Sequence, residues 1–71
     1  MIFDIYGRFR LEVLSEGDRW SIYRLASGKR LRIHDLMIPP EVEPNDIARY
    51  LDDALHEAAS PGKRVRLLEQ E

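Results

Sequence analysis

Arginine, tyrosine and histidine side chains recur at alternate positions in three segments in the first half of the chain. The six residues are Arg8, Arg10, Tyr23, Arg30, Arg32 and His34. If these segments are neighbouring strands, the alternation places all six side chains on one face of a sheet. Guanidinium groups beside an aromatic ring can bind an acidic protein surface, or can hold phosphates while the ring stacks an unpaired base. The six residues are therefore the candidate partner-binding residues.

The same pattern has a second, purely structural interpretation. The arginines would keep an uncovered sheet face soluble, while Tyr23 stacks on Arg10 across a strand pair. The whole chain carries 11 basic and 13 acidic side chains, and residues 1–35 are net basic whereas residues 36–71 are net acidic. Because a dedicated nucleic-acid-binding domain is usually strongly basic, this balance favours a protein partner over nucleic acid.

A second group of residues could do chemistry on a helix. Asp52 and His56 are one helical turn apart, a spacing that suits a divalent ion or an acid–base pair. The zinc-hydrolase helix, however, needs two histidines four residues apart with a glutamate between them. Ion pairs of Arg49 with Asp52 or Asp53 explain the same residues structurally.

The chain has no cysteine, which excludes disulfides, thiolate metal sites and a cysteine nucleophile. It also contains no glycine-rich phosphate loop and no nucleophile elbow. The sequence therefore predicts neither an enzyme nor a bound metal or cofactor, and no small-molecule substrate is evident.

Apolar and polar residues alternate from Phe3 to Val13, with Gly7 on the apolar side. A period of two predicts a half-buried strand, and a glycine within it indicates a bulge, a bend or a close approach. Together with the turn signals that follow, the pattern predicts a three-stranded antiparallel meander. Its strands span about 2–14, 20–26 and 30–36.

Two turns set the predicted register of this sheet. Turns centred on residues 16–17 and 27–28 contain the Gly residues that tight hairpins need. A slip of one residue would turn every side chain to the opposite face, so the apolar pattern decides for a two-residue second turn. The predicted partners are Val13–Trp20, Leu11–Ile22 and Phe9–Arg24, then Ile22–Ile33 and Arg24–Leu31.

The second half of the chain predicts one helix and a short last strand. Pro39 and Pro40 end the sheet, and Pro44-Asn45-Asp46 opens a helix, with Pro44 at the first helical position or Asn45 as the cap. Its apolar stripe consists of Ile47, Leu51, Ala54, Leu55 and Ala58, with Arg49, Asp52, Asp53 and His56 on the opposite, solvated side. Residues 64–68 are predicted as a possible fourth, edge strand.

These elements predict a single small α+β domain over residues 1–71, with the order βββαβ and the helix packed on one sheet face. The predicted core consists of Phe3, Ile5, Phe9, Leu11, Val13, Trp20, Ile22, Leu31, Ile33, Ile47, Leu51 and Leu55. No segment approaches the roughly 18 apolar residues of a membrane span, so no membrane contact and a cytoplasmic location are expected.

Three stretches of the chain carry a resemblance to a known family. Residues 5–13 (IYGRFRLEV), 38–41 (IPPE) and 50–57 (YLDDALHE) resemble a family of small bacterial proteins of unknown function. The resemblance covers nearly the whole chain. It implies a bacterial origin and transfers no activity and no site residue.

The predicted element order is also similar to that of HicB-type antitoxins, which bind and block a small RNA-cleaving toxin. This likeness is topological only. The Pro-Asp-Leu-Pro-Gly-like stretch expected after the second strand is replaced here by Ser27-Gly28-Lys29-Arg30. Fold analogy of this kind is a weak basis for assigning function.

The sequence as a whole thus predicts a non-enzymatic protein-interaction module. It would bind through the basic, tyrosine-bearing open face of its sheet, with another protein or a second copy of itself as the partner. The alternative is single-stranded nucleic-acid binding through the same face.

Overall fold

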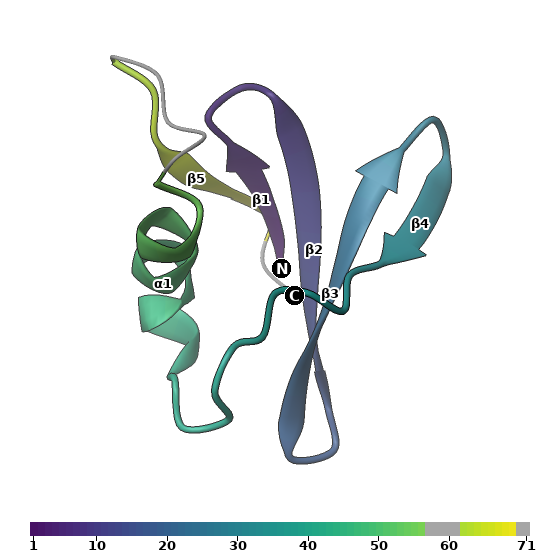
Figure 1. The fold of residues 1–71 in the computed structure, drawn as a ribbon, viewed down its shortest axis with the longest axis vertical. Helices are drawn as coiled ribbons and strands as arrows, with labels where there is room; N and C mark the ends of the chain where they lie inside the picture. The colour runs from purple at the N-terminus through teal and green to yellow at the C-terminus, as the bar shows by residue number, and fades with distance from the viewer. Residues whose placement is uncertain (57–61, 70–71) are drawn as a thin grey trace.

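The computed structural model describes residues 1–56 and 62–69 and forms an α+β fold (Figure 1). Its elements are β1 (Ile2–Ile5), β2 (Phe9–Glu16), β3 (Arg19–Ala26), β4 (Lys29–Arg32), a 3-10 turn η1 (Pro44–Asp46), α1 (Ile47–Ala54) and β5 (Val65–Glu69). The strands form one antiparallel sheet in the order β4-β3-β2-β1-β5. The predicted α+β class is confirmed, with four strands before the helix instead of three.

The predicted single strand over 2–14 is wrong, because the chain reverses after Ile5 to form the β1–β2 hairpin. Tyr6 and Gly7 both have positive φ, 55° and 70°, and the Arg8 amide donates to the Ile5 carbonyl at 2.9 Å. The connection contains three residues, so Ile5 lies opposite Phe9. Odd-numbered residues therefore face the same side before and after the turn, and the period-two pattern runs through it unbroken.

The predicted β2–β3 register is wrong by two residues. Val13 lies opposite Ile22 and not opposite Trp20, because the turn is at residues 17–18. Gly17 occupies the first central position with φ 65°, as a type II′ turn requires. Since the shift is even, the predicted facing of both strands is preserved.

The predicted β3–β4 register is confirmed. Arg24 lies opposite Leu31, and the Ile33 amide donates to the Ile22 carbonyl at 2.9 Å. Residues 27–28 both have positive φ, as in a type I′ turn. The strand itself ends at Arg32 and does not extend to residue 36.

The predicted C-terminal strand is confirmed as β5, which pairs with β1 at Ile5–Val65 and Phe3–Leu67. The register shifts between Ile2 and Phe3, leaving Leu68 as the extra residue of a bulge. β1 is therefore an interior strand.

Among the described helices, none has the length and apolar character needed to cross a bilayer.

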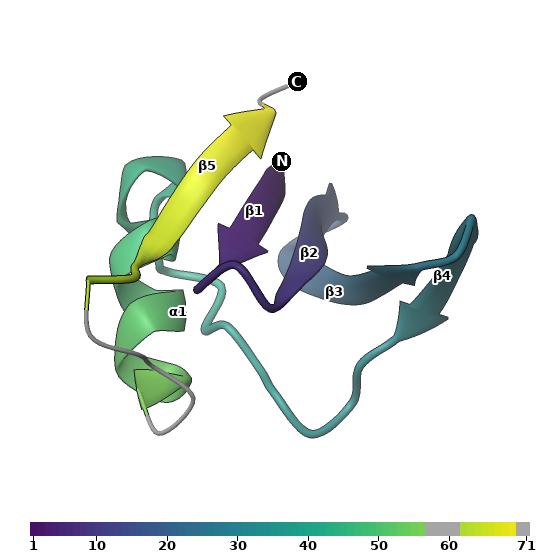
Figure 2. The same ribbon diagram turned by 90° about the horizontal axis from the view of Figure 1, so that it is seen from above.

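The core lies between the sheet and a layer made by α1 and the connecting segment 33–43 (Figure 2). Its buried apolar residues are Phe3, Ile5, Tyr6, Leu11, Val13, Ile22, Ile38, Ile47 and Leu51. Four other predicted core residues, Phe9, Trp20, Ile33 and Leu55, are partly buried against it.

Three predictions about the buried face are wrong. Leu31 is 56% exposed because neither α1 nor the connecting segment covers β4. Ala54 of the predicted apolar stripe is exposed, and Asp52 of the predicted solvated side is partly buried. Ala58 lies outside the described residues.

Candidate functional site

The sheet face opposite α1, here called the outer face, carries the even-numbered side chains of β1, β2 and β4 and the odd-numbered side chains of β3. It consists of Ile2, Asp4, Arg10, Glu12, Leu14, Glu16, Arg19, Ser21, Tyr23, Leu25, Arg30 and Arg32, joined by Arg66 of β5. Of the six candidate partner-binding residues, Arg10, Tyr23, Arg30 and Arg32 lie on this face. Arg8 lies in the β1–β2 turn and His34 lies beyond the end of β4.

Tyr23 is the aromatic centre of the outer face. The guanidinium carbon of Arg30 lies 4.6 Å from the centroid of its ring, and that of Arg32 lies 5.7 Å away. Both arginines come from β4, whose register with β3 sets Tyr23 opposite Arg32. The cationic neighbours of the ring are thus Arg30 and Arg32, and not Arg10 as the stacking interpretation expected.

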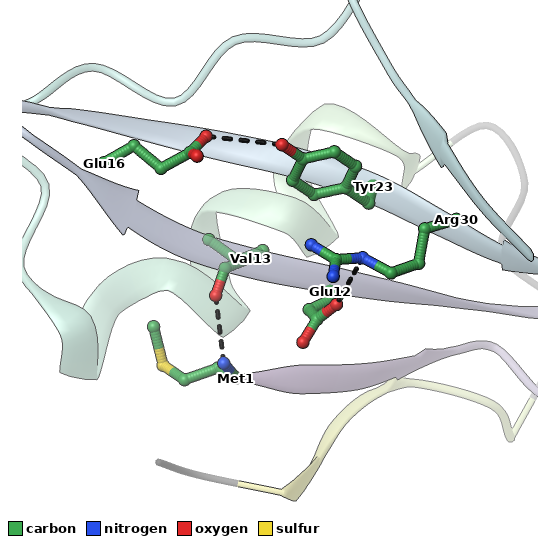
Figure 3. A network of polar contacts seen from close by, with 6 residues as sticks. All are labelled: Met1, Glu12, Val13, Glu16, Tyr23 and Arg30. Carbon is green, nitrogen blue, oxygen red and sulfur yellow. Dashed lines mark hydrogen bonds and ion pairs between the residues drawn. The ribbon is translucent and has the colours of Figure 1, made fainter.

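Two glutamates of β2 complete this group (Figure 3). Glu12 pairs with Arg30 at 3.1 Å, and Glu16 pairs with Arg32 at 3.9 Å. The Tyr23 hydroxyl donates to Glu16 at 3.4 Å. We call Glu12, Glu16, Tyr23, Arg30 and Arg32 the Tyr23 cluster.

The outer face is consequently mixed in charge. Its arginines are interleaved with Asp4, Glu12 and Glu16, and Arg66 of β5 pairs with Asp4 at 3.8 Å. Sequence reasoning counted the basic residues at even positions and omitted these acidic ones. The same alternation that placed Arg10 on this face also placed Glu12 and Glu16 there, so the signal was present in the sequence.

Ser21 is a buried residue of β3 that contacts the Tyr23 cluster. Its Oγ accepts a hydrogen bond from Arg32 Nη2 at 3.2 Å. Hydrogen bonding to Ser21, then the charge of Arg32, then hydrogen bonding to Tyr23 lower the pKa of the Glu16 carboxyl below its ordinary value of 4.5. These contacts favour the charged form of Glu16.

Replacing Ser21 by alanine is expected to raise the pKa of Glu16 toward that ordinary value, because the largest stabilising contact is lost. Carbon-detected NMR titration of the glutamate carboxyls measures the pKa of Glu16 directly. Arg49→Ala, on the exposed side of α1, is the matched control and should leave the Glu16 titration unchanged. An unaltered Glu16 pKa in the Ser21 variant would contradict this arrangement.

The second predicted group, Asp52 and His56, does not form a pair among the contacts of the described residues. Asp52 instead accepts a hydrogen bond from the buried Tyr6 hydroxyl at both its carboxylate and its backbone carbonyl. Over residues 1–56 and 62–69, no group of three or more histidine and carboxylate side chains is placed to hold a metal ion.

A groove of about 450 Å³ lies at the end of the sheet where β4 leaves β3. It is lined by Asp18, Arg19, Trp20, Ser21, Ile22, Arg32, Ile33, His34, Leu36, Met37, Ile38 and Pro40. His34 is therefore a groove residue, and Arg32 lies where the groove meets the outer face. Sequence reasoning missed this groove because it depends on where the chain departs from the sheet.

Comparison with known proteins identifies the family. Residues 1–69 match the family described as Domain of unknown function (DUF7661), and the chain belongs to it. The expected resemblance to a family of unknown function is confirmed. Comparisons with curated proteins and with solved structures give no match. The observed order, with four strands before the helix, differs from the order on which the likeness to HicB-type antitoxins rested.

Proposed function

We propose that this member of the DUF7661 family is a non-enzymatic protein-interaction module that binds a protein partner through the outer face. The observation that carries the proposal is the Tyr23 cluster, which lies on a sheet face that neither α1 nor the connecting segment covers. Tyrosine and arginine, together with tryptophan, are the residue types enriched among the energetically dominant positions of protein interfaces.

The orientation of the cluster favours binding. Tyr23 is held by its contact with Glu16 and by the stacked guanidinium of Arg30, which Glu12 holds in turn. Side chains that are ordered before association lose less conformational entropy when they are buried by a partner. Partly buried apolar side chains of the same face, Leu14 and Leu25, add contact area beside the cluster.

The charge of the cluster supports a protein partner over single-stranded nucleic acid. Arg30 and Arg32 each already face a carboxylate, so a phosphate would have to displace Glu12 or Glu16. A protein surface carrying both signs of charge can instead complement arginine and glutamate together. A second copy of the chain is one such surface.

Affinity capture from a bacterial lysate tests this function. The tagged wild type, a Tyr23→Ala/Arg30→Ala variant and Arg49→Ala as the matched control are each incubated with and without nuclease, and retained proteins are quantified by mass spectrometry. We expect a protein that wild type and Arg49→Ala retain equally in both arms. Its retention should fall by at least about tenfold in the double variant, as loss of a dominant interface position predicts.

Equal retention by all three proteins would overturn the outer face as the binding site. Loss of binding on nuclease treatment would favour nucleic acid instead. The retained protein, once purified, is titrated against wild type and the double variant by calorimetry, so that the capture result is checked with two defined components.

A further inference from the structure

The strand β3 has an open edge over its first half. Pairing with β4 begins at Tyr23–Arg32, and the Ile33 amide adds one more bond, to the Ile22 carbonyl. The chain then leaves the sheet toward α1, so residues 19–21 have no strand beside them on this edge among the described residues (Figure 1). Because backbone groups alternate in direction along a strand, Trp20 directs its N–H and C=O to the same edge as Ile22.

The groove described above lies along this open edge. Its apolar walls come from Trp20, Ile22 and Ile33 on the sheet side and from Leu36 and Met37 on the connecting segment. Met37 is 78% exposed, so its flexible side chain is available for contact.

Both walls are held in place by hydrogen bonds to backbone carbonyls. The Trp20 indole Nε1 donates to the Val42 carbonyl at 3.1 Å. The Tyr50 hydroxyl donates to the Met37 carbonyl at 2.8 Å, and the adjacent Ile38 is buried in the core. The groove is therefore formed before any ligand arrives, which lowers the entropic loss on binding.

The polar side chains at the mouth of the groove favour an acidic ligand. Arg19 and Arg32 are cationic and His34 has a ring N–H to donate, and Asp18 is the one acidic residue among the lining residues. Arg32 is already engaged by Glu16, whereas the exposed Arg19 and His34 make no ion pair within the part of the chain that the structure describes. A carboxylate entering the groove would meet these two side chains.

We propose that this groove binds an extended acidic segment of a partner protein, which adds a short strand to the open edge of β3. Main-chain hydrogen bonds to Trp20 provide affinity, as in other complexes formed by strand addition. Because side chains of an extended segment alternate in direction, apolar residues enter the groove while carboxylates reach Arg19 and His34. The proposal does not depend on Tyr23 or Arg30, since neither of these side chains lines the groove.

Trp20 provides the readout, because it is the one tryptophan of the chain and lies in the groove wall. The probes are three capped seven-residue peptides. One alternates valine with glutamate, one alternates valine with lysine, and one is the glutamate peptide with a central proline, which cannot donate a main-chain hydrogen bond at that position. Each is titrated into the intact protein while Trp20 fluorescence and the Trp20 amide NMR signal are followed.

We expect a saturable change with the glutamate peptide at a Kd below about 1 mM. Binding should weaken at least about tenfold for both the lysine and the proline peptides. Equal binding of the glutamate and lysine peptides, or no saturable change with the glutamate peptide, would overturn the proposal.

Charge-reversal variants locate the binding site. Arg19→Glu/His34→Glu should weaken binding of the glutamate peptide at least about tenfold, whereas Arg49→Glu on α1 should bind it like wild type. Both changes in the double variant are at exposed positions, and thermal unfolding checks that the variant is folded.

The outer-face variant Tyr23→Ala/Arg30→Ala separates the two proposals. It should keep its affinity for the peptide even if it loses the captured protein, so either proposal can fail without the other. Unchanged peptide binding in Arg19→Glu/His34→Glu would overturn the groove as the site. A concentration-dependent dimer in sedimentation whose Trp20 amide is protected would assign the groove to a second copy and would also overturn it.

Discussion

Replacing Leu51 by alanine is expected to lower the free energy of unfolding by about 3 kcal/mol. Leu51 is fully buried, and it lies on the side of α1 that packs against Ile5, Leu11 and the rest of the core. Removing its side chain deletes apolar contacts and leaves a cavity that the surrounding strands fill only partly. For a small domain with a total stability of roughly 5 kcal/mol, most of the stability would be lost.

Leu31→Ala makes the same chemical change at an exposed position and serves as the matched control. Leu31 is 56% exposed on β4, so its truncation should change the unfolding free energy by less than about 0.5 kcal/mol. Urea unfolding followed by Trp20 fluorescence measures both variants. Similar losses for the two leucines would contradict the observed division between covered and uncovered parts of the sheet.

Replacing Tyr6 by phenylalanine is expected to lower the unfolding free energy by about 2 kcal/mol at neutral pH, as loss of a hydrogen bond to a charged group predicts. The Tyr6 side chain is buried, and its hydroxyl donates to the Asp52 carboxylate and lies 3.1 Å from the Asp52 carbonyl. This contact ties the β1–β2 turn to α1 and explains why a non-glycine residue is held at φ 55°.

The same residue makes stability depend on pH in the alkaline range. Burial, followed by hydrogen bonding to Asp52 and the charges of Asp52 and Asp53, raises the pKa of Tyr6 from 10.0 to about 12. The unfolded chain therefore loses this proton at a lower pH than the folded chain does. The stabilisation is complete below pH 10 and is lost progressively as the pH rises to about 12.

Urea unfolding of wild type and Tyr6→Phe between neutral pH and pH 12 checks this expectation. The stability difference between the two proteins should shrink above pH 10. Tyr50→Phe, which removes a tyrosine hydroxyl bound to the Met37 carbonyl, is the matched control. A constant difference between wild type and Tyr6→Phe across this range would contradict the role given to the Tyr6 hydroxyl.

The turns show how far local sequence predicts the sheet. Ser27 and Gly28 form the hairpin turn that their residue types favour, and the register of β3 with β4 follows from it. The first hairpin was missed because Tyr6 is a poor candidate for positive φ. What holds Tyr6 there is Asp52, a contact that spans most of the chain and leaves no local signal.

The candidate site, too, was predicted only where local sequence determines it. Alternation along the strands placed Arg10, Tyr23, Arg30 and Arg32 on one face, and the observed registers keep them there. Alternation does not predict which arginine stacks on Tyr23, because that depends on how the long side chains of β4 extend. The groove depends on the departure of the chain after Ile33, where neither proline nor glycine marks the point.

The position of β5 in the sheet has a consequence for the order in which the protein assembles. The hairpins β1–β2, β2–β3 and β3–β4 join neighbouring segments and can form early, because closing short loops is fast. β1 pairs on its other side with β5, which follows the other four strands of this sheet in the chain and leaves the ribosome after them. Until then the backbone edge of β1 is unprotected, so a nascent or truncated chain lacking β5 offers that edge to other chains and is prone to aggregate.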